Sequence, residues 1–460
     1  MNREPLHPVV QLKFGIDDFV VSIPPRHLIE FTAIDKKGGS DIANFVFIDP
    51  TYHKIDRLII ATDKKDAPLL YRWGYPGNGL EKSLWRSARV ETYEPTISHS
   101  GLRINLGVRS IGSEFAALVE PRTYIGKIST VVRTIALEMN YKNENIVIEE
   151  TDDEDNETNN MEWFSGNRTR IDLIYYFMRI AKSKTNPNDN YTFKLGSDGK
   201  FYFRTSRGSK TQTKKEYRSF KVLAGDPTGG VIEFVPQYNA QQIGSWAQSI
   251  IASTYDPRTK RFEKRLLTRK TLGLEDKEND PKKGRTTAGP LVDDGKPINE
   301  QERRYNAHRH LPSRSLATGG RCSGRTSHQY SEPERAFNRV EHAFKSLHQS
   351  ISTASLSLVG LPEYSDFGPD EVYCDVLVVL PEAALGLEDI REGLIESNIE
   401  RNYSGLHWSS GRYTINDVTH TIASGYTISA NLYRSSMLDG PTSASTGPPS
   451  KPNTMYVKVQ

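Results

Sequence analysis

The segment Tyr191–Phe203 reads YTFKLGSDGKFYF, and its pattern decides how this part of the chain folds. Apolar residues alternate with polar ones on both sides of Ser197–Lys200, as they do in half-buried strands. Asp198 and Gly199 supply the left-handed conformation that a tight turn needs. The sequence therefore predicts a β-hairpin that closes on these four residues.

Two amphipathic helices are expected upstream of this hairpin. Over Ile128–Met139 an apolar residue recurs every three or four positions, which places one apolar stripe along a helix. Ile171–Ala181 shows a similar stripe behind an acidic loop. Ser165 or Thr169 can cap the amino end of this second helix, and Asp172 suits its first turn, where the helix dipole favours negative charge. Residues 126–255 are therefore interpreted as a mixed α/β domain.

Both ends of the chain show β-type patterns. In the first 125 residues, short runs at Phe45–Ile48, Arg57–Ala61 and Leu102–Val108 are separated by turn formers, a spacing typical of a barrel or sandwich. An amphipathic helix is predicted over residues 337–351. Further strands are expected at Ala354–Val359, Glu371–Leu380, Arg412–Val418 and Tyr426–Tyr433. The second β-rich region therefore begins with a helix.

The bulk composition limits the kinds of protein that this chain can be. It has 460 residues, of which 36% are hydrophobic and 25% charged, and a net charge of +3. This length predicts two to four domains, and the small net charge argues against a polyelectrolyte partner of nucleic acid. No apolar run reaches the ~18 residues of a helix that spans a membrane, and the N-terminal residues lack the pattern of a secretory signal peptide. We expect a soluble protein made in the cytoplasm, with no stable membrane association and no disulfide framework from Cys322 and Cys374.

These patterns predict an α+β protein organised in five segments. Residues 1–125 form a first β-barrel domain and residues 126–255 the α/β middle domain. Residues 256–333 form a charged, low-complexity insertion, which has too few apolar residues to order except against a partner. Residues 334–438 form a helix and a second β-barrel domain, and residues 439–460 a flexible linker with a terminal strand.

Motifs that mark catalytic, cofactor or metal sites are absent from the sequence. No glycine run with nucleotide-binding spacing follows a strand, and no GxSxG, CxxC or HExxH spacing occurs. The acidic run Glu149–Glu157 lacks the glycine and spacing of a calcium loop, so its default interpretation is a solvated loop. The sequence therefore predicts no catalytic residue, no cofactor and no metal.

A basic run is the first candidate partner-binding segment. Residues 258–270 read RTKRFEKRLLTRK, and Arg258, Arg261 and Arg265 can contact phosphates without reading sequence. Only one aromatic residue, Phe262, lies within the run, whereas proteins that bind single-stranded nucleic acid stack its bases on several aromatic side chains. A protein–protein or plain surface role is the favoured interpretation.

A short strand-like run is the second candidate. Met455–Val459 reads MYVKV and follows a linker rich in Ser, Thr, Gly and Pro. Such a run can add to the edge of another subunit's sheet, where main-chain hydrogen bonds supply the affinity. Tyr456, Val457 and Val459 are the expected contact residues.

Three blocks of sequence occur in a fixed order. The first block contains Tyr71–Gly77 (YRWGYPG), Val90–Pro95 (VETYEP) and Ser100–Ile104 (SGLRI). The second is Lys127–Arg204, with both predicted helices and the hairpin. The third begins at the helix of Phe337 and contains Ser357–Pro362 (SLVGLP), Ser410–Ile415 (SGRYTI), His420–Ile422 (HTI), Gly425–Ile428 (GYTI) and Arg434. In this order the blocks resemble the baseplate hub proteins of contractile-tailed phages, a family that includes late control protein D and the hub-like half of VgrG spikes.

The resemblance implies a fold and an assembly. Members of this family form a trimer in which each chain supplies two tube-type β-barrels, built from the N- and C-terminal regions, around the α/β middle domain. Three chains then present six barrels, which would adapt a sixfold tail tube to a threefold central spike. The insertion in residues 262–333 is longer and more charged than is usual in this family, so its role is not implied.

The resemblance also implies partners and a location. The partners are further copies of the chain, the tail tube protein, the central spike protein and other baseplate wedge or sheath-initiator proteins. DNA would pass transiently through a central channel. The implied location is the tail baseplate of the virion, assembled in the host cytoplasm.

Two functions from other classes remain open at this point. One is a peptidoglycan hydrolase associated with the tail tip, for which Glu363 and Asp366 are an imaginable carboxylate pair. The other is a nucleic-acid-binding protein that uses residues 258–270. The first predicts clearing of cell-wall substrate, and the second an affinity that falls steeply with salt.

Overall fold

The computed structural model divides into two compact units. The first consists of Met1–Thr213, Leu358–Asp370 and Asp417–Ala430, and the second of Lys214–Ser357, Glu371–Asn416 and Asn431–Gln460. The structure describes residues 7–16, 19–51, 53–65, 67–76, 80, 83–99, 101–152, 162–185, 190–205, 230–238, 249–256, 261–268, 309–311, 337–343, 346, 352–360, 373–376 and 411–433. The first unit therefore contains most of the described residues.

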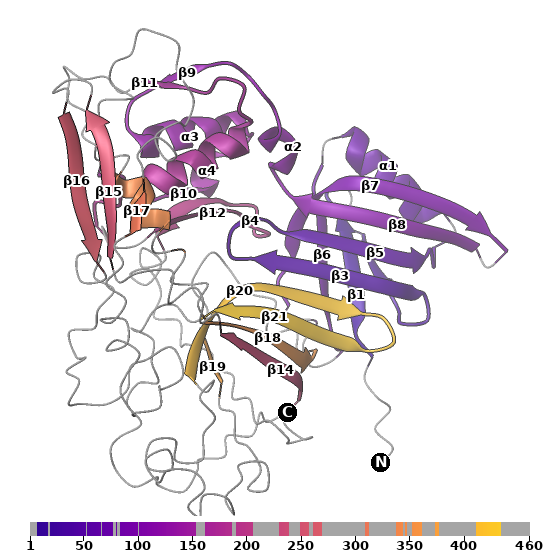
Figure 1. Ribbon diagram of the computed structural model, residues 1–460. Helices are drawn as coiled ribbons and strands as arrows, with labels where there is room; N and C mark the ends of the chain where they lie inside the picture. The colour runs from indigo at the N-terminus through magenta and orange to yellow at the C-terminus, as the bar shows by residue number, and fades with distance from the viewer. Residues whose placement is uncertain are drawn as a thin grey trace, which may run out of the picture. The chain divides into compact units, whose positions relative to one another are not determined.

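A large antiparallel sheet forms the core of the first unit (Figure 1). Its strands are β1 (Val9–Phe14), β2 (Val20–Ile23), β3 (Leu28–Lys36), β5 (Ile42–Ile48), β6 (Leu69–Gly74), β7 (Arg86–Ser98), β8 (Gly101–Ser110), β20 (Gly411–Ile422) and β21 (Tyr426–Tyr433). Of the last two strands, Asp417–Ile422 and Tyr426–Ala430 belong to this unit. The strand order in this unit is β21-β20-β3-β5-β8-β7-β6-β1-β2. The α+β class that the sequence predicts is confirmed.

The sheet joins residues from distant parts of the chain. Asp417–Ile422 of β20 pair antiparallel with Phe31–Lys36 of β3, so strands from both ends of the chain lie side by side. Trp73 on β6 packs on Phe31 of β3 with 4.9 Å between ring centroids, although three strands separate β6 from β3 in the order. The sheet is therefore strongly curled, but the pairing of the described strands does not close into a barrel.

Alternation along the strands creates the interior of this curled sheet. On β8, Leu102, Ile104, Leu106 and Val108 are buried, and the exposed Arg103 and Asn105 lie between them. The largest completely buried side chains from the N-terminal strands are Phe14, Phe31, Phe45, Phe47 and Trp73. Each contributes on the order of 1.5–3 kcal/mol by leaving water, so the curled sheet has a genuine aromatic core.

The strand expected at residues 57–61 is wrong, because these residues lie in helix α1 (Lys54–Lys64). Ile55 and Ile59 are both buried, and their four-residue spacing places them on one helical face. The backbone N–H of Ile55 donates to the hydroxyl of Thr51 at 3.1 Å, which satisfies one of the free donors at the start of the helix. An apolar run of this length fits a helix or a strand equally well.

An α/β part lies in the first unit. Its elements are β4 (Gly39–Ser40), α2 (Ser113–Ala116), β9 (Thr123–Ile125), α3 (Ile128–Glu138), η1 (Asn143–Asn145), β10 (Ile146–Ile148), β11 (Glu162–Phe164), α4 (Arg170–Ile180), β12 (Tyr191–Leu195) and β13 (Phe201–Thr205). A four-stranded sheet, β10-β13-β12-β4, shares one apolar core with α3 and α4 (Figure 1). The two helices and the hairpin predicted from the sequence are confirmed.

Local signals at the two ends of this segment act as expected. The hydroxyl of Thr169, and not that of Ser165, caps α4 by accepting from the backbone N–H of Asp172 at 3.1 Å. Gly199 has a φ of 77°, the left-handed conformation required by the hairpin turn. The carboxylate of Asp198 accepts from the backbone N–H of Lys200 at 3.1 Å. The cap therefore fixes where α4 begins, and the turn fixes the pairing register of the hairpin.

Two kinds of contact fasten the α/β part to the large sheet. Strand β12 pairs in parallel with β4, and Lys194 lies opposite Gly39. The ammonium of Lys194 lies 3.2 Å from Oδ1 of Asp41, and both side chains are only 2% exposed. The backbone N–H of Asp41 donates to the hydroxyl of Ser110 on β8 at 3.0 Å. A buried ion pair therefore links β12 to the strand region around β5 and β8.

The second unit contains further strands of the C-terminal half. They are β14 (Val231–Tyr238), β15 (Ser249–Asp256), β16 (Arg261–Thr268), β17 (Arg309–Leu311), β19 (Tyr373–Val376) and the part of β18 (Ser352–Val359) up to Ser357, together with a helical stretch at residues 337–343. The strands β15, β16 and β17 were not predicted from the sequence. In this unit β15 pairs antiparallel with β16 and parallel with β17. Tyr373–Val376 pair with Gly411–Thr414, the part of β20 that belongs to the second unit. Most of the insertion predicted at residues 256–333 lies outside the described residues.

Candidate functional site

The basic run lies partly on a strand. Arg261 and Arg265 are in β16, where they pair with Asp256 and Ala252 of β15. Arg258 lies outside the described residues, and so do Tyr456, Val457 and Val459. The two predicted binding segments therefore remain predictions.

An exposed apolar surface lies on the two-stranded sheet formed by β9 and β11. Tyr124 pairs with Trp163 in the register, and both side chains are buried. The neighbouring Ile125 and Phe164 therefore point to the opposite face, where they are 59% and 43% exposed. We call Ile125 and Phe164 the β9–β11 surface. Grouped exposed apolar side chains of this kind are typical of protein contacts.

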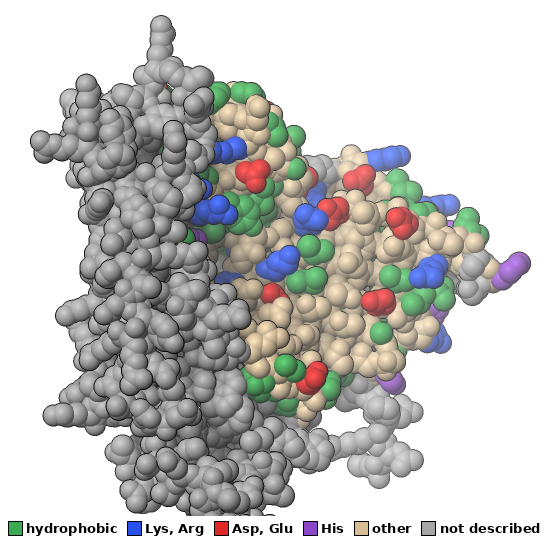
Figure 2. Space-filling view, viewed as in Figure 1, with side chains coloured by type: hydrophobic (Ala, Val, Ile, Leu, Met, Phe, Trp, Pro, Cys, Tyr) green, Lys and Arg blue, Asp and Glu red, His purple; other side chains and the backbone are tan. Residues whose placement is uncertain are grey.

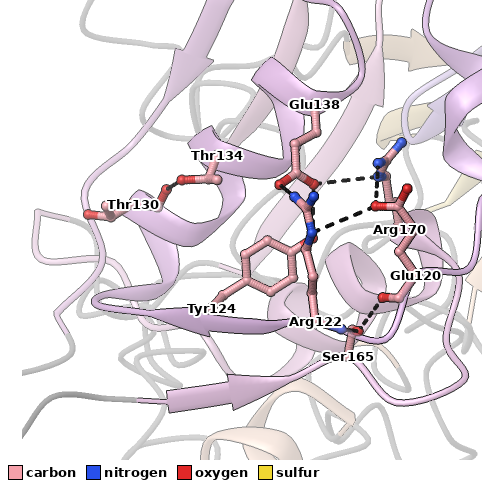
Figure 3. A network of polar contacts seen from close by, with 8 residues as sticks. All are labelled: Glu120, Arg122, Tyr124, Thr130, Thr134, Glu138, Ser165 and Arg170. Carbon is pink, nitrogen blue, oxygen red and sulfur yellow. Dashed lines mark hydrogen bonds and ion pairs between the residues drawn. The ribbon is translucent and has the colours of Figure 1, made fainter.

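A network of charged side chains lies around the hydroxyl of Tyr124, whose side chain is on the face of β9 opposite to Ile125 (Figure 3). The guanidinium of Arg122 contacts the carboxylate of Glu138 and lies 3.8 Å from that of Glu120. Arg170 lies 3.1 Å from Glu120 and 3.6 Å from Glu138. Two cations and two anions therefore alternate, and each charge has partners of opposite sign.

Hydrogen bonds hold this network in place. The hydroxyl of Tyr124 donates to Glu138 at 3.0 Å, and burial together with this carboxylate raises the pKa of Tyr124 to about 12. The hydroxyl of Ser165 donates to the backbone oxygen of Glu120 at 2.7 Å and accepts from the backbone N–H of Arg122 at 2.8 Å (Figure 3). The arrangement suits a rigid, charge-balanced surface, because each acid is already engaged by a base or a hydroxyl.

Strands β7 and β8 form a long hairpin. Strand β6 pairs with β7 only at Arg86–Ala88. Beyond Val90, the strand that pairs with β7 among the described residues is β8, on one side, so the other edge of β7 has no strand neighbour there. Pro95 lies in this outer stretch and has no N–H to offer, which limits indiscriminate strand addition at an open edge. Ile97, close to the turn, is 83% exposed. The hairpin therefore presents an apolar side chain while its edge is protected.

The visible face of the described residues carries mixed charge. Figure 2 shows acidic, basic and hydrophobic side chains interspersed on this face, with no broad region of one sign. Such a face has no strong electrostatic attraction for a polyanion. Contacts of this face with a partner would therefore depend on shape and local chemistry.

A second polar network is buried where β20 and β21 meet the N-terminal strands. The indole N–H of Trp73 donates to the hydroxyl of Tyr426 at 2.9 Å, and Nδ1 of His420 lies 2.9 Å from the same hydroxyl. Arg86 forms an ion pair of 3.1 Å with Asp35, and its guanidinium lies 4.1 Å above the ring of Trp73. We call Asp35, Trp73, Arg86, His420 and Tyr426 the buried network.

Sequence reasoning missed both the β9–β11 surface and the buried network. His420 and Trp73 stand in quoted motifs, but local patterns do not reveal that residues far apart in the chain meet. The hydrogen bond from Trp73 to Tyr426 spans 353 positions. Burial and the neighbouring Arg86 hold the pKa of His420 well below its usual value, so this imidazole is neutral.

Two other kinds of site are absent from the described residues. Among the described residues, no helix has both the length and the apolar character to cross a membrane. In the same part of the chain, no cluster of three or more His, Cys, Asp or Glu side chains is arranged to hold a metal ion. These findings leave the surface and the network above as the notable features of the described residues.

Comparison with known proteins gives structural matches alone. No family model matches the sequence, and no curated protein does so either. The structure of a tail protein from Neisseria meningitidis matches with a TM-score of 0.51 and 7% identity, over 93% of this chain and 96% of that one. A 43 kDa prophage tail protein from Shewanella oneidensis matches with a TM-score of 0.48 and 10% identity, over 94% and 100% of the two chains. An Escherichia coli component of the type VI secretion system matches with a TM-score of 0.40 and 7% identity, over 88% and 73%.

The first of these matches concerns the whole fold. It covers nearly all of both chains, so the similarity includes the α/β part as well as the large sheet. At 7% identity it shows a shared fold and no shared residue chemistry. The chain therefore has the fold of the Neisseria tail protein.

Proposed function

We propose that this chain is a structural component of a phage-type tail, located at the baseplate. The observation that carries the proposal is the fold that it shares with the Neisseria tail protein over 93% of its length. The order of the three sequence blocks supports the same function independently. The direct pairing of β20 with β3 also agrees with a domain built from both ends of one chain.

Within the baseplate, we assign the chain to the hub at the distal end of the tail tube. Three copies, each with two tube-type domains, would offer six similar surfaces to the tube and three to the central spike. Closed threefold symmetry with an internal pseudo-repeat therefore matches a sixfold tube to a threefold spike without a second adaptor protein. The partners are then the tube protein, the spike and neighbouring baseplate proteins, and the central channel would pass DNA.

Two features of the described surface support an assembly role. The β9–β11 surface leaves apolar side chains in water, which costs free energy unless another protein covers them. The Glu120–Arg122–Glu138–Arg170 network joins the segment before β9 to α3 and α4, because Arg122 contacts Glu138 and Glu120 lies 3.1 Å from Arg170. An exposed apolar surface on a strand pair that is fixed to the helices suits contact with a neighbouring copy.

Substitution in the β9–β11 surface should therefore weaken the trimer. We expect the purified chain to be a trimer of about 156 kDa by light scattering, three times its 51.9 kDa mass, and Ile125→Asp to shift it towards the monomer. The reason is that an aspartate would be desolvated in the interface without a partner. Since Ile125 is 59% exposed within the chain, its unfolding free energy should change by less than about 0.5 kcal/mol.

Leu84→Asp is the matched control for this substitution. Leu84 is also exposed, at 56%, but it does not belong to the β9–β11 surface. This variant should keep the wild-type mass. A monomeric wild-type chain would contradict the proposed function, whereas a trimer that survives Ile125→Asp would contradict only the assignment of this surface.

A further inference from the structure

Two side chains connect the C-terminal strands to the far side of the curled sheet. Strand β20 is hydrogen-bonded to β3, but His420 on β20 also packs on Trp73 of β6 with 5.0 Å between ring centroids. Tyr426 on β21 accepts the indole hydrogen bond of Trp73 at 2.9 Å. Gly360 adds a third connection, because its backbone oxygen accepts from the hydroxyl of Tyr75 at 3.2 Å. The C-terminal strands are therefore fastened across the interior as well as along their edge.

The hydrogen bonds within the buried network assign its protons. The indole of Trp73 is only a donor, so it occupies one acceptor position of the Tyr426 hydroxyl. The hydroxyl has one proton of its own to donate, and Nδ1 of His420 lies 2.9 Å away. We therefore assign this hydrogen bond as Tyr426 donating to an unprotonated Nδ1, which places the imidazole proton on Nε2.

The charged groups around His420 disfavour a second cation. Arg86, on β7, is paired with Asp35 of β3 at 3.1 Å, and these side chains are only 3% and 2% exposed. Nε2 of His420 lies 3.9 Å from Oδ2 of Asp35, which is too long for a hydrogen bond. The carboxylate of Asp35 therefore compensates Arg86 first, and His420 is completely buried beside that cation.

The other titratable groups at this site are phenols. Burial raises the pKa of Tyr71, on β6, and that of Tyr426, on β21. Burial also raises the pKa of Tyr75, which follows β6. These phenols stay neutral in the acidic range, so between pH 5 and 7.5 the group of the network that changes charge when it becomes accessible is His420.

We propose that His420 is a pH-sensitive switch that controls the attachment of β20 and β21 to the N-terminal sheet. When the imidazole is neutral, its Nδ1 accepts from the hydroxyl of Tyr426, and its buried Nε2 has no hydrogen-bond partner among the described residues. When it is protonated, Nδ1 becomes a donor directed at a hydroxyl that already accepts from Trp73, and the hydroxyl proton of Tyr426 loses its acceptor. The C-terminal strands then detach from the inner face, which lets the imidazolium reach water.

The direction of the pH effect follows from linkage. The pKa of His420 is lower in the attached state than its ordinary value of about 6.5 in the open chain. The stabilisation is therefore complete above about pH 6.5 and is lost as the pH falls below that value. The equilibrium constant for opening rises about tenfold per pH unit in this range, or about 30-fold between pH 7.5 and 5.0. The proposal is independent of any role in a phage tail.

Hydrogen–deuterium exchange measures this opening directly. Peptides from β20 and β21 of the full chain are followed at pH 7.5 and 5.0, and the rates are corrected for intrinsic exchange. We expect about 30-fold more opening at pH 5.0 in the wild type. His420→Gln should show no such rise, because its amide oxygen accepts from Tyr426 and does not titrate. His99→Gln, a substitution of an exposed histidine near the β7–β8 turn, should behave as the wild type.

Three results would overturn the proposal. One is a wild type in which corrected exchange of β20 and β21 does not rise at pH 5.0. Another is His420→Gln with the wild-type rise. A third is an equal rise in α3 and α4, because the effect would then be general unfolding. If His420→Gln does not fold, His420→Asn replaces it. This side chain does not titrate either, so a rise equal to that of the wild type would also overturn the switch.

Discussion

Asp41→Ala should lower the free energy of unfolding of the first unit by about 3–5 kcal/mol, as expected when one partner of a buried ion pair is removed. Oδ1 of Asp41 lies 3.2 Å from the ammonium of Lys194, and both side chains are 2% exposed. The same oxygen accepts from the backbone N–H of Lys36 at 3.0 Å. Without the carboxylate, a buried cation faces a cavity and a backbone donor loses its acceptor. Urea denaturation of variant and wild type at pH 7.5 measures the difference.

The control is an ion pair of similar geometry at the surface. Arg109 lies 2.8 Å from Glu91, but these side chains are 39% and 43% exposed. Arg109→Ala should therefore cost about 1 kcal/mol or less, because water already screens both charges. If the two variants lost equal stability, burial of the Asp41–Lys194 pair would not be what attaches the α/β part to the sheet.

Trp73→Ala should also destabilise the first unit by about 3–5 kcal/mol, the usual cost of truncating a large buried aromatic side chain. Its indole is 0% exposed and packs on Phe31 at 4.9 Å and on His420 at 5.0 Å. The substitution opens a cavity and removes the donor that Tyr426 accepts from. We expect β20 and β21 to lose protection from hydrogen exchange first, since Trp73 is one of their contacts across the interior.

Trp85→Ala is the matched control for this truncation. Trp85 is half-buried, and its main contact is the guanidinium of Arg72, 4.4 Å from the ring. A contact of this kind at the surface contributes about 0.5–1 kcal/mol, so the variant should stay close to wild type. Comparable losses in the two variants would contradict the conclusion that Trp73 is central to the core.

The parts of the fold that local pattern can reveal were predicted well. The stripe in Ile128–Met139 and the alternation in Tyr191–Phe203 depend on neighbouring residues, and both became the expected elements. Residues 57–61 were misassigned because a short apolar run does not show its period. The contact of Trp73 with Tyr426 was not predictable, since no local rule connects positions 353 apart.

The candidate surfaces could be predicted only in part. Ile125 and Phe164 look like core positions in a sequence, because alternation does not reveal that only one face of β9 and β11 is covered. The sequence showed the basic run but did not place it on a strand, and its partner depends on chemistry outside this chain. Arg258, Tyr456, Val457 and Val459 are still predictions, because they lie outside the described residues.

Image averaging of the purified chain in negative stain tests the central claim most directly, namely that three copies present six similar domains to a tail tube. The account predicts a ring with threefold symmetry whose rim shows six lobes of similar size. Single compact particles, or a ring whose lobes equal its number of chains, would contradict it.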